Sequence, residues 1–352
     1  MALGAVALQL GVLAGLRCAS ALGDLGAGFD QSMAEKYLWI QQLTLMPEAE
    51  LATMRCGLAC DALPEVSQVH VTEDSGPLNT RGLVATFGGD CLVTFKGSTS
   101  ISNYLLGDFD IFLEQPFSSC PHCRVHKGFY KSWSSLAAET NRALEDLGCG
   151  TKPLRMSGHS LGGAMALLAA FQLSDKYRIK EIYTFGQPRV GNDAWVSAFA
   201  ARMANVTFFR VVSYMDPVPH LPPSWLMGYR HVGPEVWYDT TTQGSPAFCA
   251  AGQDSCSGQY SLFRCLFHTC DHCSYLGLNP CKANDPQPAC VQGLGQRCPF
   301  TYHPFCAAGP MYESGRAPLE EAKQEVEAAG GLSSEAERVA GPCYVITWYK
   351  SA

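Results

Sequence analysis

Near its centre the chain has the order Pro153-Leu154-Arg155-Met156-Ser157-Gly158-His159-Ser160-Leu161-Gly162-Gly163. Pro153–Ser157 is typical of a short buried strand, and the Ala- and Leu-rich segment Leu161–Leu173 is typical of a helix. Ser160 therefore falls in a tight turn between strand and helix, where Gly158 and Gly162 permit a close approach of the two elements. Gly-x-Ser-x-Gly also occurs by chance, but this context predicts that Ser160 is a nucleophile.

The same alternation of strands and helices extends from about residue 30 to residue 240. Helices are predicted at Gln31–Leu45, at Gly128–Leu147 and from near Asn192 onward, and strands at Gly82–Phe87, Cys91–Phe95, Ile182–Phe185 and Thr207–Ser213. Alternation of this kind indicates an α/β fold with a mainly parallel sheet covered by helices.

Composition excludes two classes of protein. Hydrophobic residues make up 47% of the chain and charged residues 16%, which is not the composition of a disordered protein. The formal net charge is −7 and there is no basic run, so a nucleic-acid partner is not expected.

The N-terminus and the cysteines both indicate secretion. Met1–Leu16 is almost wholly apolar but shorter than the roughly 20 residues that span a bilayer, and small residues at 19–21 offer a cleavage site. We therefore expect a signal peptide at residues 1–21, although its usual basic start is missing and a short buried helix is the alternative. Removal of Cys18 leaves 16 of the 17 cysteines, an even number, as a disulfide framework in an oxidising compartment requires.

Two regions are expected after the signal peptide. Residues 22–310 form the main domain, and within it the cysteine-rich segment 249–306 is interpreted as loops held by disulfides. Residues 311–352 form a tail whose charged, Ala- and Glu-rich part is typical of a solvated helix or a loose segment.

A nucleophilic serine needs a base, and the base needs a carboxylate to orient it. Asp216 follows the apolar run Phe208–Ser213, so it stands just past a strand end, at the sheet edge where sites gather. The rigid turn Pro217–Pro223 follows it. Five histidines come later in the chain and the residues alone do not choose among them: His220, His231, His268, His272 and His303.

Several motifs together resemble the class 3 lipases, the fungal-type triacylglycerol lipases and their relatives. The motifs are Val125–Phe129, Gly158–Gly163, Gly186–Asn192 and Asp216–Pro219, and the resemblance covers roughly residues 80 to 280. It implies an α/β-hydrolase fold and a secreted serine hydrolase that cleaves lipid esters through an acyl-enzyme on Ser160.

The resemblance also suggests which histidine is the base. The segment around His231 is similar to one that carries a structural histidine in the family. Asp271–Gly277 is similar to the family segment that carries the catalytic histidine, so the triad is expected to be Ser160, Asp216 and His272, with His231 as the alternative base. His126 and His159 fall inside family motifs as packing residues.

Two backbone or side-chain donors are expected to form an oxyanion hole. One is the backbone N–H of Leu161, at the positive end of the predicted helix. The family resemblance assigns the other to Ser98 in Phe95-Lys96-Gly97-Ser98, where Lys96 replaces the usual arginine. The apolar stretch between Ser98 and Cys120 corresponds to the family's lid, with an ordinary surface helix as the alternative.

No metal or cofactor is expected. Cys120-Pro121-His122-Cys123 could form half of a zinc site, as could the residues Cys265, His268, Cys270, His272 and Cys273, but disulfides are the preferred interpretation. Three functions remain open. The first is hydrolysis of triacylglycerol-like esters at a lipid–water interface, with transient contact to a membrane or lipid droplet. The second is cleavage of phospholipid, galactolipid or feruloyl esters, and the third is lipid binding without catalysis.

Overall fold

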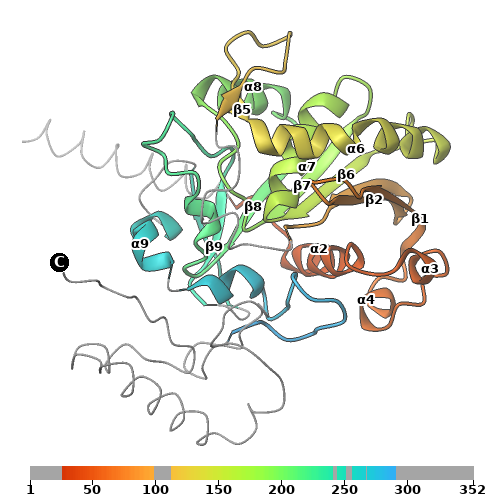
Figure 1. The fold of residues 1–352 in the computed structure, drawn as a ribbon. Coiled ribbons are helices and arrows are strands. Elements are labelled where there is room, and N and C mark those ends of the chain that lie inside the picture. Colours follow the sequence, from red (N-terminus) through yellow and green to blue (C-terminus); the bar gives the residue numbers. More distant parts are fainter. Residues whose placement is uncertain (1–25, 99–111, 241–243, 251–255, 267, 291–352) are drawn as a thin grey trace, which may run out of the picture.

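The structure is a computed structural model that describes residues 26–98, 112–240, 244–250, 256–266 and 268–290 (Figure 1). The predicted signal peptide, most of the predicted lid and the tail at 311–352 lie outside these residues. Within the described part of the chain, no helix is long and apolar enough to cross a bilayer.

An eight-stranded sheet forms the centre of the fold, in the order β1-β2-β3-β6-β7-β8-β9-β10. The pairs from β3 to β9 are parallel, whereas β1, β2 and β3 form an antiparallel meander and β10 pairs antiparallel with β9. The strands are β1 (Val66–Asp74), β2 (Thr80–Phe87), β3 (Asp90–Phe95), β6 (Leu154–His159), β7 (Ile179–Phe185), β8 (Thr207–Ser213), β9 (Glu235–Tyr238) and β10 (Ala247–Cys249). The predicted α/β fold with a mainly parallel sheet is confirmed.

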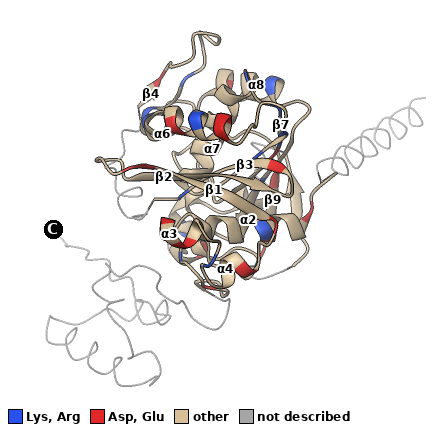
Figure 2. Ribbon diagram, turned by 90° about the vertical axis from the view of Figure 1, so that its right-hand side faces the viewer, with Lys and Arg blue, Asp and Glu red and all other residues tan. Residues whose placement is uncertain are grey.

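Helices cover both faces of the sheet (Figures 1 and 2). One face carries α6 (Lys127–Asp146), α7 (Leu161–Leu173) and α8 (Asp193–Arg202), and the other carries α2 (Gln31–Leu43), α3 (Glu48–Leu51) and α4 (Leu58–Asp61). Each layer has its own hydrophobic core. In α7 every residue except Gln172 is buried, so the helix behind Ser160 is fixed from all sides.

Shorter elements complete the fold beside the sheet. Beyond the main layers lie the ribbon of β4 (Leu113–Glu114) and β5 (Val125–His126), helix α9 (Leu262–Cys265), and the 3-10 helices η1 (Val218–His220), η2 (Cys256–Gln259) and η3 (Thr269–Cys273). The sequence did not predict β1. Only two of its nine residues are buried, so it lacks the apolar pattern that marks a buried strand.

Six disulfides lie among the described residues. The pairs are Cys56–Cys60, Cys91–Cys149, Cys120–Cys123, Cys249–Cys256, Cys270–Cys290 and Cys273–Cys281. The predicted disulfide framework is therefore present, including three bonds in the cysteine-rich segment. Cys265 is the one described cysteine outside a disulfide, and it is buried. Burial raises the pKa of its thiol to about 12.

Candidate active site

Ser160 lies in a strained turn between β6 and α7. Its φ of 57° and ψ of −128° are unusual for a residue with a side chain. The turn is possible only because Gly158 and Gly162, two residues before and after Ser160, have no side chain. A Cβ on Gly158 would lie 2.1 Å from the carbonyl oxygen of Gly162, and a Cβ on Gly162 would lie 2.0 Å from that of Phe95. Ser160 itself is 3% exposed.

Asp216 and His272 form a buried pair beside this turn. The ring nitrogen Nδ1 of His272 lies 2.9 Å from Asp216 Oδ1 and 2.8 Å from Oδ2, and both side chains are fully buried. Because a carboxylate only accepts hydrogen bonds, Nδ1 carries the proton and Nε2 is left as the basic nitrogen. Nε2 hydrogen-bonds to no atom of the described residues.

Two further donors hold the carboxylate of Asp216. The backbone N–H of Val218 donates to Oδ1 at 2.8 Å, and the hydroxyl of Tyr275 donates to Oδ2. Burial alone would raise the pKa of Asp216, but the charge and hydrogen bonds of its partners lower it below the ordinary value. Burial, and then the charge of Asp216, raises the pKa of Tyr275, which stays a donor.

Gly186 explains how the pair fits against the sheet. It follows β7 with a φ of +56°, and a Cβ there would lie 2.6 Å from Asp216 Oδ2 and 2.9 Å from His272 Nδ1. The backbone N–H of Ser160 donates to the carbonyl oxygen of Phe185 at 2.8 Å. Ser160, Asp216 and His272 are thus gathered past the carboxyl ends of β6, β7 and β8, as expected for a site on a parallel sheet.

His231 lies elsewhere and has another partner. Its Nε2 donates to the carbonyl oxygen of Pro219 at 2.7 Å, so it holds the turn that follows Asp216 rather than the carboxylate itself. Arg189 donates to carbonyl oxygens of the same turn, at His220 and Pro222. Between the two candidate bases, the geometry favours His272.

The segment that leads to Ser98 packs against the turn of Ser160. A Cβ on Gly97 would lie 3.1 Å from the carbonyl oxygen of His159 and 3.3 Å from Cβ of Ser160. Ser98, next in the chain, is half-buried, and Leu161 is the first residue of α7. Burial, and then the charge of Arg81, lowers the pKa of Lys96, the residue that departs from the family pattern.

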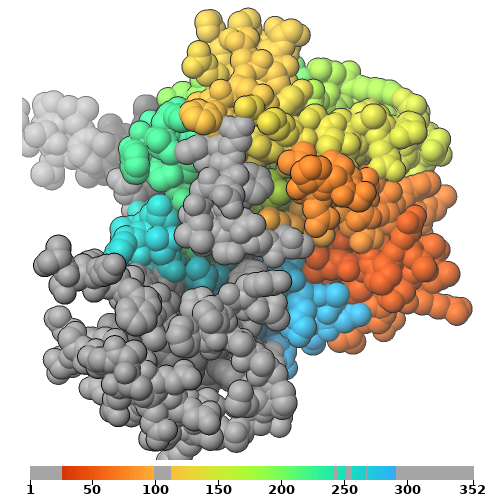
Figure 3. Space-filling view, in the orientation of Figure 1, coloured from red at the N-terminus to blue at the C-terminus, as the bar shows by residue number. Residues whose placement is uncertain are grey.

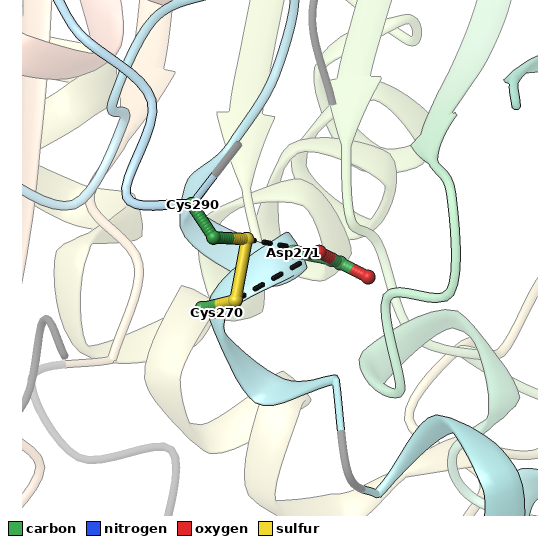
Figure 4. Close-up of side chains that lie close together, drawn as sticks. All are labelled: Cys270, Asp271 and Cys290. Atoms are coloured by element: carbon green, nitrogen blue, oxygen red, sulfur yellow. Dashed lines mark hydrogen bonds between the residues drawn. A yellow bond between two sulfur atoms is a disulfide. The ribbon is translucent and has the colours of Figure 1, made fainter. Parts of the chain in front are cut away.

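All the cysteines of the two possible zinc sites except Cys265 are used in disulfides. Cys120 bonds to Cys123, and Cys270 and Cys273 bond to Cys290 and Cys281. A close group of Cys270, Asp271 and Cys290 does exist (Figure 4), but its two sulfur atoms are joined to each other. The carboxylate of Asp271 lies 3.0 Å from Cys290 Sγ, and its pKa is raised by burial.

Buried histidines near the site should make stability depend on pH. Burial lowers the pKa of His159 to about 3 and that of His220 to about 4, and lowers that of His231 well below its ordinary value. Below pH of about 6.5 the unfolded chain takes up protons at these positions and the folded chain does not. The free energy of unfolding should therefore fall as the pH drops.

Urea unfolding at about pH 7 and about pH 4.5 measures this change in the free energy of unfolding. Each histidine contributes about 1.4 kcal/mol per pH unit, so we expect the free energy of unfolding to fall by at least about 3 kcal/mol. The raised pKa of Asp271 acts in the opposite direction and reduces the loss. His220→Gln should remove about a third of the pH dependence. A free energy of unfolding that stays level over this range would contradict the assignment of neutral buried histidines.

Comparison with known proteins finds lipases among the proteins to which this chain is similar. Residues 92–225 match the family model described as lipase (class 3). The chain is 35% identical to a secreted mono- and diacylglycerol lipase of Fusarium solani over 152 residues, 43% of this chain and 44% of that protein. It is 30% identical to a lipase of Rhizomucor miehei over 242 residues, 65% of this chain and 63% of that protein. It thus spans 44% and 63% of the lengths of these two relatives.

The fold is similar to theirs as well. The solved structure of a Rhizomucor miehei lipase–propeptide complex matches with a TM-score of 0.60 and 26% identity, over 73% of this chain and 84% of that one. The similarity identifies the sheet and its helices as an α/β-hydrolase fold. The family model covers Ser98, Ser160 and Asp216 but ends before His272, so the choice of base rests on the geometry.

Proposed function

The chain belongs to the class 3 lipase family, and from this premise we propose that it is a serine hydrolase that cleaves the carboxylic esters of lipids. The observation that carries the proposal is the buried Asp216–His272 pair beside the strained turn of Ser160. A lipid carrier would need neither the two glycines of that turn nor a histidine oriented by a carboxylate.

In the proposed reaction, the hydroxyl of Ser160 attacks the ester carbonyl while Nε2 of His272 takes its proton. Asp216 holds the proton on Nδ1 and stabilises the imidazolium that forms. The tetrahedral oxyanion accepts hydrogen bonds from Leu161 and Ser98. The C–O bond then breaks, the alcohol leaves with the proton from His272, and a water molecule releases the fatty acid from Ser160 by the same steps.

Tyr275 and Gly186 support this chemistry without taking part in it. Because the Tyr275 hydroxyl and the Val218 N–H both donate to Asp216, the carboxylate is held in one orientation toward His272. Gly186 leaves the space that the pair occupies. Buried, oriented donors of this kind reduce the reorganisation that the transition state would otherwise require.

The proposed substrates follow from the relatives, and the proposed location follows from the relatives and the disulfides. Proteins named mono- and diacylglycerol lipase and lipase are among the relatives, so acylglycerols are the proposed substrates. We also propose that the protein is secreted, because the disulfides need an oxidising compartment and relatives are named as secreted lipases.

A panel of lipid esters tests the proposal directly. Purified protein is incubated with emulsified tri-, di- and monoacylglycerol, phosphatidylcholine, a galactolipid and ethyl ferulate, and the released acid is measured. We expect acylglycerols to be cleaved fastest. Faster cleavage of the phospholipid, galactolipid or ferulate would correct the substrate class, and lipid binding without any hydrolysis would overturn the enzyme assignment.

Large apolar side chains are exposed on the two segments that lead to the site. Trp225, on the loop after Asp216, is 82% exposed, and Phe263, on α9 shortly before His272, is 72% exposed. The two segments meet where Cys265 Sγ lies 3.5 Å from His220 Nε2, and they lie side by side in Figure 3, coloured green and cyan. An aromatic side chain in water next to a lipid site is suited to insertion into a lipid surface.

We therefore expect Trp225→Ser and Phe263→Ser each to weaken adsorption to an acylglycerol emulsion about tenfold. Each change removes an aromatic ring and most of the free energy that its insertion into lipid would contribute. Sedimentation of the emulsion measures the bound fraction. Leu58→Ser is the matched control, because Leu58 is 48% exposed on α4, away from α9 (Figure 1). Hydrolysis of a soluble short-chain ester should not change. Equal effects of all three substitutions would contradict a specific lipid-binding face.

A further inference from the structure

The imidazole of His159 lies beside that of His272. It is 3% exposed, its ring centre is 4.4 Å from that of His272, and its Nε2 is 2.7 Å from the backbone carbonyl oxygen of His272. A carbonyl oxygen only accepts, so Nε2 of His159 must be the donor. The side chain next to Ser160 in sequence therefore bonds to the backbone of the residue that carries the proposed base.

The backbone of His159 is held by hydrogen bonds to α2, which covers one face of the sheet. Its backbone N–H donates to Gln41 Oε1 at 3.1 Å, and Gln41 Nε2 donates to the hydroxyls of Thr94 at 2.8 Å and Ser157 at 2.9 Å. Gln41 belongs to α2 and is buried. This network connects α2, β3 and β6 beneath the site, so the position of His159 is fixed by the core.

A third part of the site also packs on His159. A Cβ on Gly97 would lie 3.2 Å from its Nδ1 and 3.1 Å from its carbonyl oxygen. His159 is therefore in contact with the turn of Ser160, with η3 through His272, and with the segment that leads to Ser98. Disulfides join η3 to residues 281 and 290, but these partners belong to the same cysteine-rich segment and do not tie η3 to β6.

We propose that His159 is a positioning residue for catalysis, and that its Nε2–H···O=C hydrogen bond to His272 fixes the base-bearing η3 relative to Ser160. The inference rests on the proposed function of Ser160 and His272. Without this bond, η3 has one tie fewer to the rigid sheet, and the base can move away from the serine hydroxyl. A displacement of about 1 Å at a reacting group lowers the rate by about 100-fold.

Two variants of nearly equal length separate this role from packing. In His159→Gln the amide nitrogen can still donate near the position of Nε2, whereas His159→Met fills similar space with no donor. With a soluble ester, we expect kcat to fall about 10- to 100-fold for the methionine variant and at most about threefold for the glutamine variant, with KM unchanged in both. Thermal unfolding of the two variants should be similar. Equal kcat values for both variants, whether normal or reduced, would overturn the inference.

Side-chain ¹⁵N resonances of the wild-type protein give a readout that needs no turnover. They should show His159 as a neutral ring protonated on Nε2 from about pH 8 to about pH 5. The ¹⁵N resonances of His272 should shift in the methionine variant and be restored in the glutamine variant. A wild-type protein that hydrolyses no ester would refute the proposed function alone, while protonation of His159 on Nδ1 would refute the hydrogen bond itself.

Discussion

Replacing Ser160 with alanine is expected to lower kcat for ester hydrolysis by about 10⁵- to 10⁶-fold. The change removes the hydroxyl that attacks the ester and leaves only the rate that the oxyanion donors and substrate binding can supply. Alanine fits the same turn, because the space that Gly158 and Gly162 leave does not depend on the hydroxyl. Initial rates on an acylglycerol emulsion and on a soluble ester measure the loss, with circular dichroism to check the fold.

Ser132→Ala is the matched control for that experiment. Ser132 is also a buried serine, but it belongs to α6 and has no place in the proposed reaction. Its replacement should leave the rate close to that of the wild type. If Ser160→Ala kept more than about a tenth of the activity, Ser160 would not be the nucleophile.

Replacing His272 with alanine should lower kcat nearly as much as replacing Ser160, by about 10⁵-fold or more. Among the described residues, His272 is the one histidine that bonds to the carboxylate of Asp216, so no other base can take its place. His231→Ala should instead cost stability and at most about tenfold in rate, since it removes a hydrogen bond to the turn after Asp216. Thermal unfolding and kcat, measured on both variants, separate the two effects. An inactive His231→Ala beside a near-normal His272→Ala would reverse the assignment.

The sequence predicted the parts of the fold whose apolar pattern is regular. The helix Leu161–Leu173 and the strand Thr207–Ser213 have the predicted bounds. Other helix ends differ from the predicted ends where a capping hydrogen bond sets them. For example, α6 begins at Lys127, because His126 Nδ1 accepts the backbone N–H of Phe129. Capping depends on a few hydrogen bonds, which periodicity does not reveal.

The sequence predicts the positions of Ser160 and Asp216 because each follows a strand with a clear apolar pattern, at the edge where a parallel sheet exposes its sites. His272 lies on the short 3-10 helix η3, in a segment without apolar periodicity, and the residues alone left five histidines as candidates for the base. Its orientation depends on Tyr275, Gly186 and the disulfides around η3, which are contacts between distant segments.

The pairing of the cysteines also depends on contacts between distant segments, which the sequence does not reveal. Their even number predicts a framework, but Cys91–Cys149 joins residues 58 positions apart, at β3 and just after α6. Such a pair is set by the fold and not by spacing. The sequence indicates only a packing role for His159, and no pattern in it signals that the ring reaches the backbone of His272, 113 residues later.

Covalent labelling with a fluorophosphonate, followed by peptide mass spectrometry, tests the central claim most directly, because the reagent reacts with a serine that a neighbouring base activates. The account predicts one adduct, on Ser160, and a labelling rate that falls by orders of magnitude in His272→Ala but not in His231→Ala. An adduct on another residue, or no adduct on folded wild-type protein, would contradict it.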